Sequence, residues 1–147
     1  MANLAYFGPG TNIEAAIVAD IAVANSQMIG LLNMWQSEPI HNATLAMAAR
    51  GAIMSLIVDR RMEFLANPRL DELVAAGVEI RLDKHERSIK SQYLNLDSTR
   101  IWTGSYLYQP QYKTRYASEI SRLEDGNIIT AYNTDWDLHY AHSVPYP

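Results

Sequence analysis

The sequence predicts a single α/β domain in which a mixed sheet is flanked by helices. Its 147 residues, 48% of them hydrophobic, are enough to bury one core without disulfides or metals. Short apolar runs alternate with helical segments in the first half of the chain, and strand-like segments gather in the second half. Because no linker or low-complexity segment divides the chain, we expect residues 1–147 to form one domain.

After Pro9 and Gly10, the sequence predicts a helix and two buried strands. Thr11 stands three residues before Glu14, which is the spacing of a capping box, and predicts a helix that runs to about Ala24. Nearly continuous apolar runs at 28–34 and 53–58 are typical of strands covered on both faces. These strands therefore belong at the centre of a parallel arrangement.

Proline and glycine mark two further helices. Pro39 suits a first helical turn and Gly51 a position just past a last turn, so a helix connects the two strands as a βαβ unit. An Asn-Pro pair at 67–68 opens a third helix and Gly77 closes it. The alternation of residues 78–82 then predicts a half-exposed strand.

The second half changes to strands separated by polar turns. Strand-like segments cover 90–97, 101–106 and 118–123. A last helix starts near Asn127 and leaves 144–147 as a tail.

Composition limits the function classes. The absence of cysteine excludes disulfides, thiolate metal sites and cysteine nucleophiles. A net charge of −4 argues against a broad basic surface for nucleic acid, although it leaves a local basic groove open. Polar residues interrupt the segment 15–35 too often for a membrane span, and the first residues do not form a secretory signal. We therefore expect a cytoplasmic protein without membrane association.

Several local phrases occur in a specific order. Residues 48–51 (Ala-Ala-Arg-Gly) lead into the second buried strand, and residues 73–80 read Leu-Val-Ala-Ala-Gly-Val-Glu-Ile. Asp97 stands seven residues before Gly104, which belongs to a Thr-Gly-Ser phrase. With the β-α-β-α-β-α-β order, these phrases resemble the small single-domain bacterial endonucleases of the phospholipase D superfamily over essentially the full chain. The resemblance implies a phospholipase D-like mixed sheet flanked by helices.

The resemblance also implies a chemistry. In the family an H-x-K-x-x-x-x-D signature supplies a histidine that attacks phosphorus and a lysine that binds the non-bridging oxygens. Small members take a second histidine from a symmetry mate. The resemblance therefore predicts a homodimer with an isologous interface along the strands that carry the signature, here called the motif strands.

Alignment on Asp97 and the Thr-Gly-Ser phrase replaces the catalytic groups. Lys90 takes the place of the histidine and Gln92 that of the lysine, while Ala117 replaces an asparagine two residues before Glu119. A protonated lysine is a poor nucleophile, and glutamine brings no charge to a phosphate. The motif is therefore degenerate, and we expect a catalytically silent homo-oligomeric binding or structural module. The candidate site in this register comprises Lys90, Gln92, Asp97, Ser105 and Glu119.

Two alternatives stay open. His85 and Arg87 have the separation of the family histidine and lysine, if five extra residues are accommodated before Asp97. The chain would then be an active, metal-independent phosphodiesterase or nuclease with His85 as nucleophile and Arg87 as phosphate clamp. The other alternative is an unrelated three-layer α/β protein.

Residues 106–116 form a tyrosine-rich segment in which aromatic rings are interspersed with cations. Such a surface can stack on bases or bind phosphate-containing ligands, nucleic acid among them. The same tyrosines could instead cover the core and a dimer seam. The candidate binding residues are Tyr106, Tyr108, Tyr112 and Arg115.

The remaining histidines suggest no metal site from the sequence. His41 falls in the polar opening of the second helix and is expected to face solvent. His139 and His142 are three residues apart, which can place two imidazoles on one helical face. Because no third ligand lies near them in the sequence, we expect neither a metal nor a cofactor.

Overall fold

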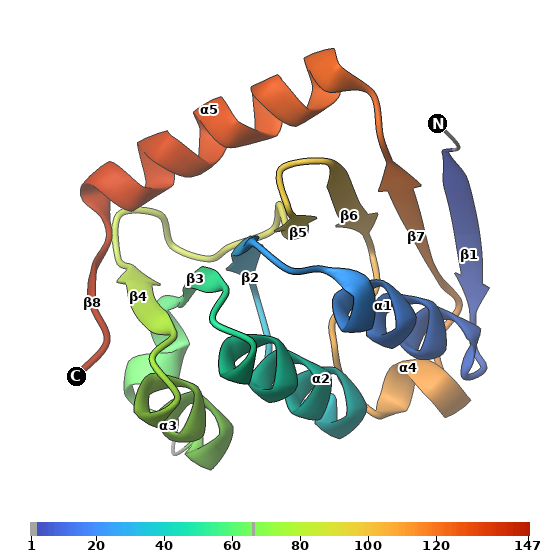
Figure 1. Ribbon diagram of the computed structural model, residues 1–147. Coiled ribbons are helices and arrows are strands. Elements are labelled where there is room, and N and C mark those ends of the chain that lie inside the picture. Colours follow the sequence, from blue (N-terminus) through green and yellow to red (C-terminus); the bar gives the residue numbers. More distant parts are fainter. Residues whose placement is uncertain (1–2, 66) are drawn as a thin grey trace.

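A computed structural model describes residues 3–65 and 67–147 of the chain. The described residues form one eight-stranded sheet in the order β1-β7-β6-β5-β2-β3-β4-β8, with helices on both faces (Figure 1). The strands are β1 (Leu4–Gly8), β2 (Gln27–Leu32), β3 (Ile53–Asp59), β4 (Glu79–Asp83), β5 (Tyr93–Leu96), β6 (Arg100–Gly104), β7 (Ser118–Leu123) and β8 (Val144–Pro145). The helices are α1 (Asn12–Val23), α2 (Glu38–Ala49), α3 (Pro68–Ala75), α4 (Gln111–Thr114) and α5 (Gly126–His142), with a 3₁₀ turn, η1 (Arg60–Glu63). The predicted mixed α/β sheet is confirmed.

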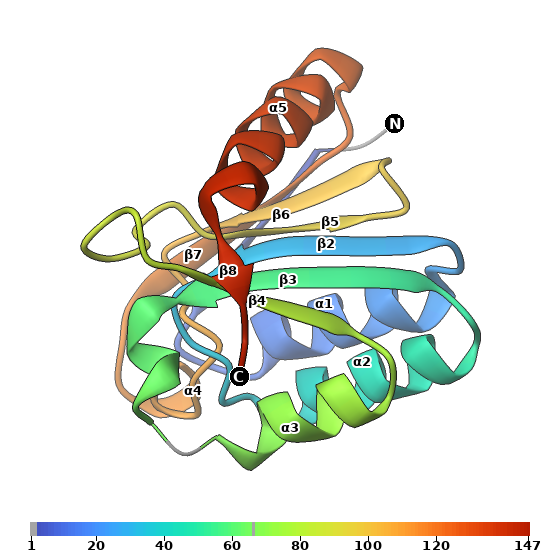
Figure 2. The ribbon, with the colours of Figure 1, turned by 90° about the vertical axis from the view of Figure 1, so that its left-hand side faces the viewer.

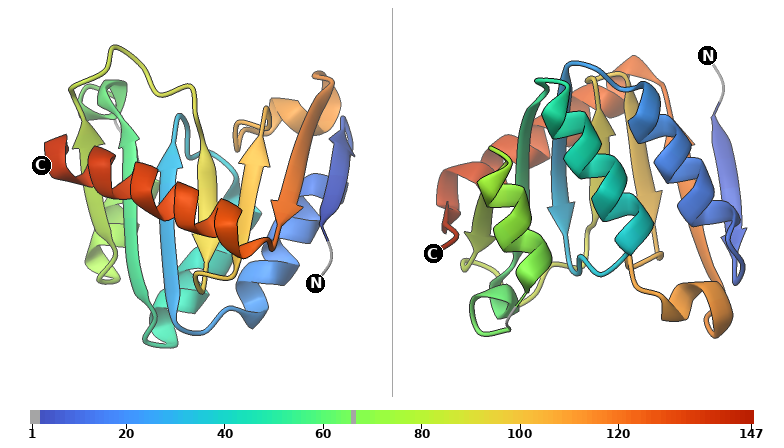
Figure 3. Two further views of the ribbon diagram at one scale, coloured as in Figure 1. Left: turned by 90° about the horizontal axis from the view of Figure 1, so that it is seen from above. Right: turned by 60° about the horizontal axis from the view of Figure 1, so that its bottom comes forward.

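The central strands are parallel and buried on both faces. β2 pairs in parallel with β3, and β3 with β4, whereas the other neighbours are antiparallel. The helices α1, α2 and α3 lie on one face and α5 crosses the other (Figures 2 and 3). This arrangement explains why the two apolar runs show no alternation with polar residues.

Each face of the sheet has its own core. Side chains of successive strand residues point to opposite faces, so Leu32 and Leu56 pack with the larger cluster around α1 and α2. Ile29 and Ile57 belong to the smaller cluster with Trp136 of α5. The indole N–H of Trp136 donates to the carbonyl of Gly30, 3.2 Å away, and fixes α5 against the sheet.

Two helix starts follow the predicted signals and one does not. Pro39 and Pro68 occupy the first turns of α2 and α3, and Ser37 also caps α2 by accepting the N–H of Ile40. The predicted capping box of α1 is wrong, because the Thr11 side chain makes no capping hydrogen bond. Glu14 is instead buried and accepts a 2.7 Å hydrogen bond from the hydroxyl of Ser37.

The predicted C-terminal tail is part of the sheet. β8 pairs antiparallel with β4, through Val144 opposite Leu82. Arg81 reinforces the joint, since its guanidinium donates to the hydroxyl and the carbonyl of Ser143 at 2.6 and 2.7 Å. The short strand covers polar backbone groups that the edge of β4 would otherwise expose.

The strand directions bring several chain segments to one end of the sheet. β2, β3, β4 and β6 finish at this end, and the antiparallel strands β5 and β7 begin there. In open α/β sheets, ligand sites gather at the carboxyl ends of the strands. None of the described helices has the length and hydropathy that a membrane span requires.

Candidate functional site

A cavity of about 340 Å³ lies at the end of the sheet where β6 finishes and β5 begins, between these two strands and α5. The polar phenol of Tyr93 donates to Asp135 of α5 at 2.8 Å, and burial together with this carboxylate raises the Tyr93 pKa. The cavity is lined by Lys90, Ser91, Gln92, Tyr93, Thr103, Gly104, Ala131, Tyr132 and Asp135.

Gln92 is held rigidly at the wall of this cavity. Its side chain is only 4% exposed, and its amide nitrogen donates to the carbonyls of Tyr106 at 2.9 Å and Gly104 at 3.4 Å. The hydroxyl of Thr103 donates to the Gln92 carbonyl at 3.0 Å. The amide oxygen of Gln92 is buried and has no hydrogen-bond partner among the described residues. The amide nitrogen is therefore committed to the protein backbone.

Ser105 and Glu119 are joined through their backbones beside Gln92. The Ser105 hydroxyl accepts the N–H of Glu119, and the Ser105 N–H donates to the Glu119 carbonyl, both at 3.0 Å. A Cβ at Gly104 would lie 2.3 Å from the Glu119 carbonyl oxygen, so only glycine permits this approach of β6 to β7. The structure thus brings Lys90, Gln92, Ser105 and Glu119 to the same end of the sheet.

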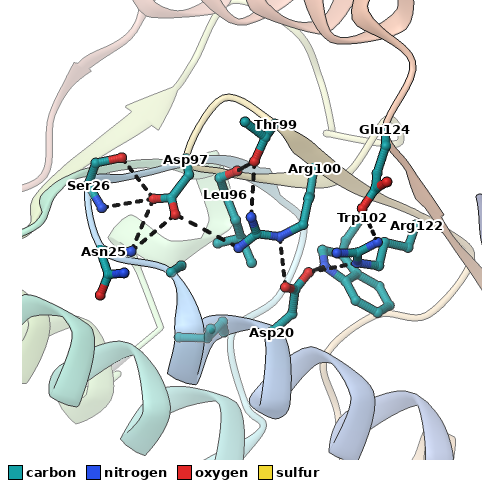
Figure 4. A network of polar contacts seen from close by, with 12 residues as sticks. Asp20, Asn25, Ser26, Leu96, Asp97, Thr99, Arg100, Trp102, Arg122 and Glu124 are labelled. Atoms are coloured by element: carbon teal, nitrogen blue, oxygen red, sulfur yellow. Dashed lines mark hydrogen bonds and ion pairs between the residues drawn. The ribbon is translucent and has the colours of Figure 1, made fainter. Parts of the chain in front are cut away.

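Asp97 does not join them. It follows β5, whereas Gln92 precedes it, so about 17 Å of extended chain separates the two residues. The Asp97 carboxylate accepts the backbone N–H groups of Asn25, Ser26 and Gln27 at 2.8–3.2 Å (Figure 4). Burial alone would raise the Asp97 pKa, but these hydrogen bonds lower it to about 2. Its place among the predicted catalytic residues is corrected to that of an anchor for the α1–β2 turn.

A buried carboxylate also stabilises this opposite end of the sheet. Asp20 of α1 accepts the indole N–H of Trp102 at 2.7 Å (Figure 4). It also forms ion pairs with Arg100 at 2.7 Å and Arg122 at 3.0 Å. The network ties α1 to β6 and β7. It lies at the opposite end of these strands from the candidate site.

His85 and Arg87 lie elsewhere on the same end. His85 follows β4, which is four strand positions from β6, a distance of about 19 Å across the sheet. The side chain of His85 is 67% exposed, and its ring stacks on that of His142 at 4.4 Å. Arg87 is exposed in the same loop. Within one chain, the structure therefore does not bring His85 to Ser105 and Glu119.

The tyrosine-rich segment divides into a buried and an open part. Tyr106 and Tyr108 are 2% and 1% exposed, and burial raises both of their pKa values. The Tyr108 ring stacks on Trp35 at 5.9 Å. These two tyrosines are core residues, so their prediction as a stacking surface for ligands is wrong. Tyr112 is half-buried and Arg115 is exposed.

The structure also revises the predictions for the remaining histidines. His41 was expected to face solvent, but it is 3% exposed and its Nδ1 accepts the indole N–H of Trp35 at 3.1 Å. His139 and His142 do not form an isolated pair, because Asp83 and Glu86 lie against them. Sequence reasoning missed these carboxylates, since more than fifty residues separate them from the histidines.

Comparisons with known proteins show which sequences and folds this chain resembles. No family model matches the chain. A phospholipase D of Rickettsia bellii is 25% identical over 88 residues, which are 60% of this chain but 44% of that protein, so the match spans less than half of the relative.

Solved structures match over nearly the whole chain. Nuc from Salmonella typhimurium, a phospholipase D family member, aligns with a TM-score of 0.88 at 13% identity over 99% of this chain and 97% of its own. NucT from Helicobacter pylori aligns with a TM-score of 0.85 at 13% identity, over 99% of both chains. TrmBL2, an archaeal chromatin protein with a novel mode of DNA binding, aligns with a TM-score of 0.73 at 7% identity, over 99% of this chain and 55% of its own. The chain therefore has the phospholipase D fold, in agreement with the family resemblance of its sequence.

Proposed function

We propose that this chain is a phospholipase D-like binding module that has no phosphodiesterase activity and recognises phosphate-containing ligands as a homo-oligomer. The observation that carries the proposal is the state of Gln92. This residue takes the position of the family lysine, yet it is neutral, buried and hydrogen-bonded to two backbone carbonyls. A group in this state cannot stabilise the charge that develops on a phosphate during attack.

Lys90 supports ligand binding rather than catalysis. It is exposed at the mouth of the cavity, where a cation can attract phosphate oxygens. Because the whole chain carries a net charge of −4, recognition of an anion depends on such local cations. TrmBL2, which shares the fold, binds DNA, and this supports nucleic acid as the ligand class here.

A turnover assay tests the catalytic half of the proposal. The purified protein is incubated with bis(p-nitrophenyl) phosphate and with single-stranded and duplex DNA, with and without EDTA, beside a His85→Ala variant. We expect no turnover above that of the variant, because the sequence alignment assigns Lys90 and Gln92, which line the cavity, to the positions of the nucleophile and the phosphate-binding lysine.

The same assay decides the second candidate function, an active phosphodiesterase that uses His85. One contact favours it: Nδ1 of His85 lies 3.1 Å from Glu86, and a carboxylate in this position orients an imidazole. EDTA-insensitive turnover that disappears in the His85→Ala variant would establish this function and overturn the silent module.

A binding experiment tests the second part of the proposal, the recognition of phosphate-containing ligands. Fluorescence anisotropy with a labelled single-stranded oligonucleotide is recorded over a salt series for the wild type and for Lys90→Gln. We expect the variant to bind several-fold more weakly and to reduce the salt slope by about one, as loss of one phosphate contact requires. Lys84→Gln is the matched control, because Lys84 lies in the same loop but pairs with Glu63 at 2.6 Å. Equal losses in both variants, or no binding by the wild type, would contradict the proposal.

A further inference from the structure

The C-terminal end of α5 lies over the end of β4 and brings two histidines to two carboxylates. His139 and His142 are one helical turn apart, so their rings share one side of α5. Asp83 is the last residue of β4, and Glu86 follows it in the loop toward β5. One ligand atom from each of the four side chains lies within 4.8 Å of the other three.

The separations of these atoms fit a single small cation. Oδ2 of Asp83 lies 2.8 Å from Nδ1 of His139 and 3.2 Å from Nε2 of His142. Oε2 of Glu86 lies 3.2 Å from the same His142 nitrogen and 3.7 Å from the His139 nitrogen. Ligands at zinc-bond lengths on the corners of a tetrahedron are about 3.3 Å apart, which falls within this range.

The donor set selects the class of metal. Two imidazoles and two carboxylates suit zinc or a related first-row transition ion, whereas calcium and magnesium require oxygen ligands. We propose that Asp83, Glu86, His139 and His142 form a Zn²⁺ site that clamps the end of α5 to β4. Four protein ligands close the coordination shell, as in structural zinc sites. The proposal does not depend on the function assigned to the neighbouring cavity.

Neighbouring groups fix the orientation of the proposed ligand side chains. The Asp83 side chain is 1% exposed, and its other oxygen accepts the backbone N–H of His85 at 3.0 Å. Oε2 of Glu86 is buried and faces the two histidine nitrogens. Nε2 of His139 faces Asp135 at 3.6 Å, and Asp135 in turn accepts the hydroxyl of Tyr93. A carboxylate behind a histidine fixes the ring and its tautomer for metal binding.

The charges of Asp83 and Glu86 also favour a bound cation. Two carboxylates, one buried and one half-buried, face one point and bring two negative charges together there. A divalent cation bound at that point would neutralise the two carboxylates.

Isothermal titration of the EDTA-treated and dialysed full chain with ZnCl₂ tests the site. We expect one Zn²⁺ per chain, and Co²⁺ in its place should give the visible absorption of a tetrahedral complex. Free Zn²⁺ at 100 times its Kd should raise the Tm by about 5–10 °C. Circular dichroism and the Tm in EDTA show whether each variant is folded.

Graded variants separate a metal site from a network of ion pairs. His139→Gln should raise the Kd for Zn²⁺ by more than about 100-fold. Asp135→Asn should raise it by about 10-fold or less, because Asp135 lies 3.6 Å from Nε2 of His139, beyond hydrogen-bond distance. His85→Gln, which removes the ring stacked on His142 but no metal ligand, should raise the Kd far less than His139→Gln does. Absence of binding by the wild type would overturn the proposal. So would equal Tm shifts in the wild type and His139→Gln, or a loss in His85→Gln as large as in His139→Gln.

Discussion

Asp97 illustrates how one side chain sets the pH dependence of stability. Its pKa in the folded protein is about 2, below the value of about 3.9 in an unfolded chain. The carboxylate therefore contributes stability above about pH 4, and this contribution is lost as the pH falls toward 2. We expect Asp97→Asn to lower the free energy of unfolding by about 1–2 kcal/mol at pH 7. The deficit should shrink between pH 4 and pH 2 in urea titrations.

Asp137→Asn provides the control for this titration. Asp137 is exposed on α5, and its replacement removes the same charge without removing the hydrogen bonds from the α1–β2 turn. Equal losses for the two variants, or a deficit for Asp97→Asn that does not change with pH, would contradict the anchoring role of Asp97.

The helix α5 depends on a single cap at its N-terminus. Asp125 accepts the N–H groups of Asn127 and Ile128 at 2.9 and 3.0 Å. We expect Asp125→Ala to lower the free energy of unfolding by about 1 kcal/mol, whereas Asp125→Asn, which retains a capping oxygen, should lose less than half of this. Chemical denaturation of the three proteins checks the prediction. A loss in the Asn variant equal to that in the Ala variant would mean that charge, rather than capping, matters.

Helices and central strands were predictable because their signals are local. Pro39 lies in the first turn of α2 and Gly51 just beyond its last turn, and the two apolar runs became β2 and β3. The failures occurred where distant residues compete for a side chain. Glu14 was assigned to a local cap but bonds to Ser37, and Val144 was assigned to a tail but pairs with β4. Neither partner can be found from spacing along the chain.

In the candidate site, too, contacts between neighbouring strands were predictable, whereas contacts between distant segments were not. Alignment on the Thr-Gly-Ser phrase grouped Gln92, Ser105 and Glu119, and the pairing of β5, β6 and β7 brings these residues close together. The pairing of His139 with Asp83 was not predictable, since it depends on the path of α5 across the sheet (Figure 3). The burial of Tyr106 was not predictable either, because a run of tyrosines fits a core and a binding surface equally well.

The proposed homo-oligomer concerns the entire chain and gives the last prediction. If the motif strands form an isologous interface, the ends of β5, β6 and β7 lie near a two-fold axis, together with the loop that precedes β7. Tyr116 is in this loop and is 47% exposed. We expect light scattering to give about twice the 16.6 kDa mass of the chain, and Tyr116→Asp to raise the dimer Kd at least tenfold, because it would bury an unpaired charge.

Phe64→Asp is the matched control for this interface. Phe64 is 80% exposed after β3, on the other half of the sheet, so its replacement adds the same charge away from the proposed axis. Dissociation by Tyr116→Asp alone would place the interface along the motif strands. A monomeric wild type would contradict the homo-oligomer. Equal dissociation by both variants would attribute the effect to net charge, since each adds one negative charge to a chain that already carries −4.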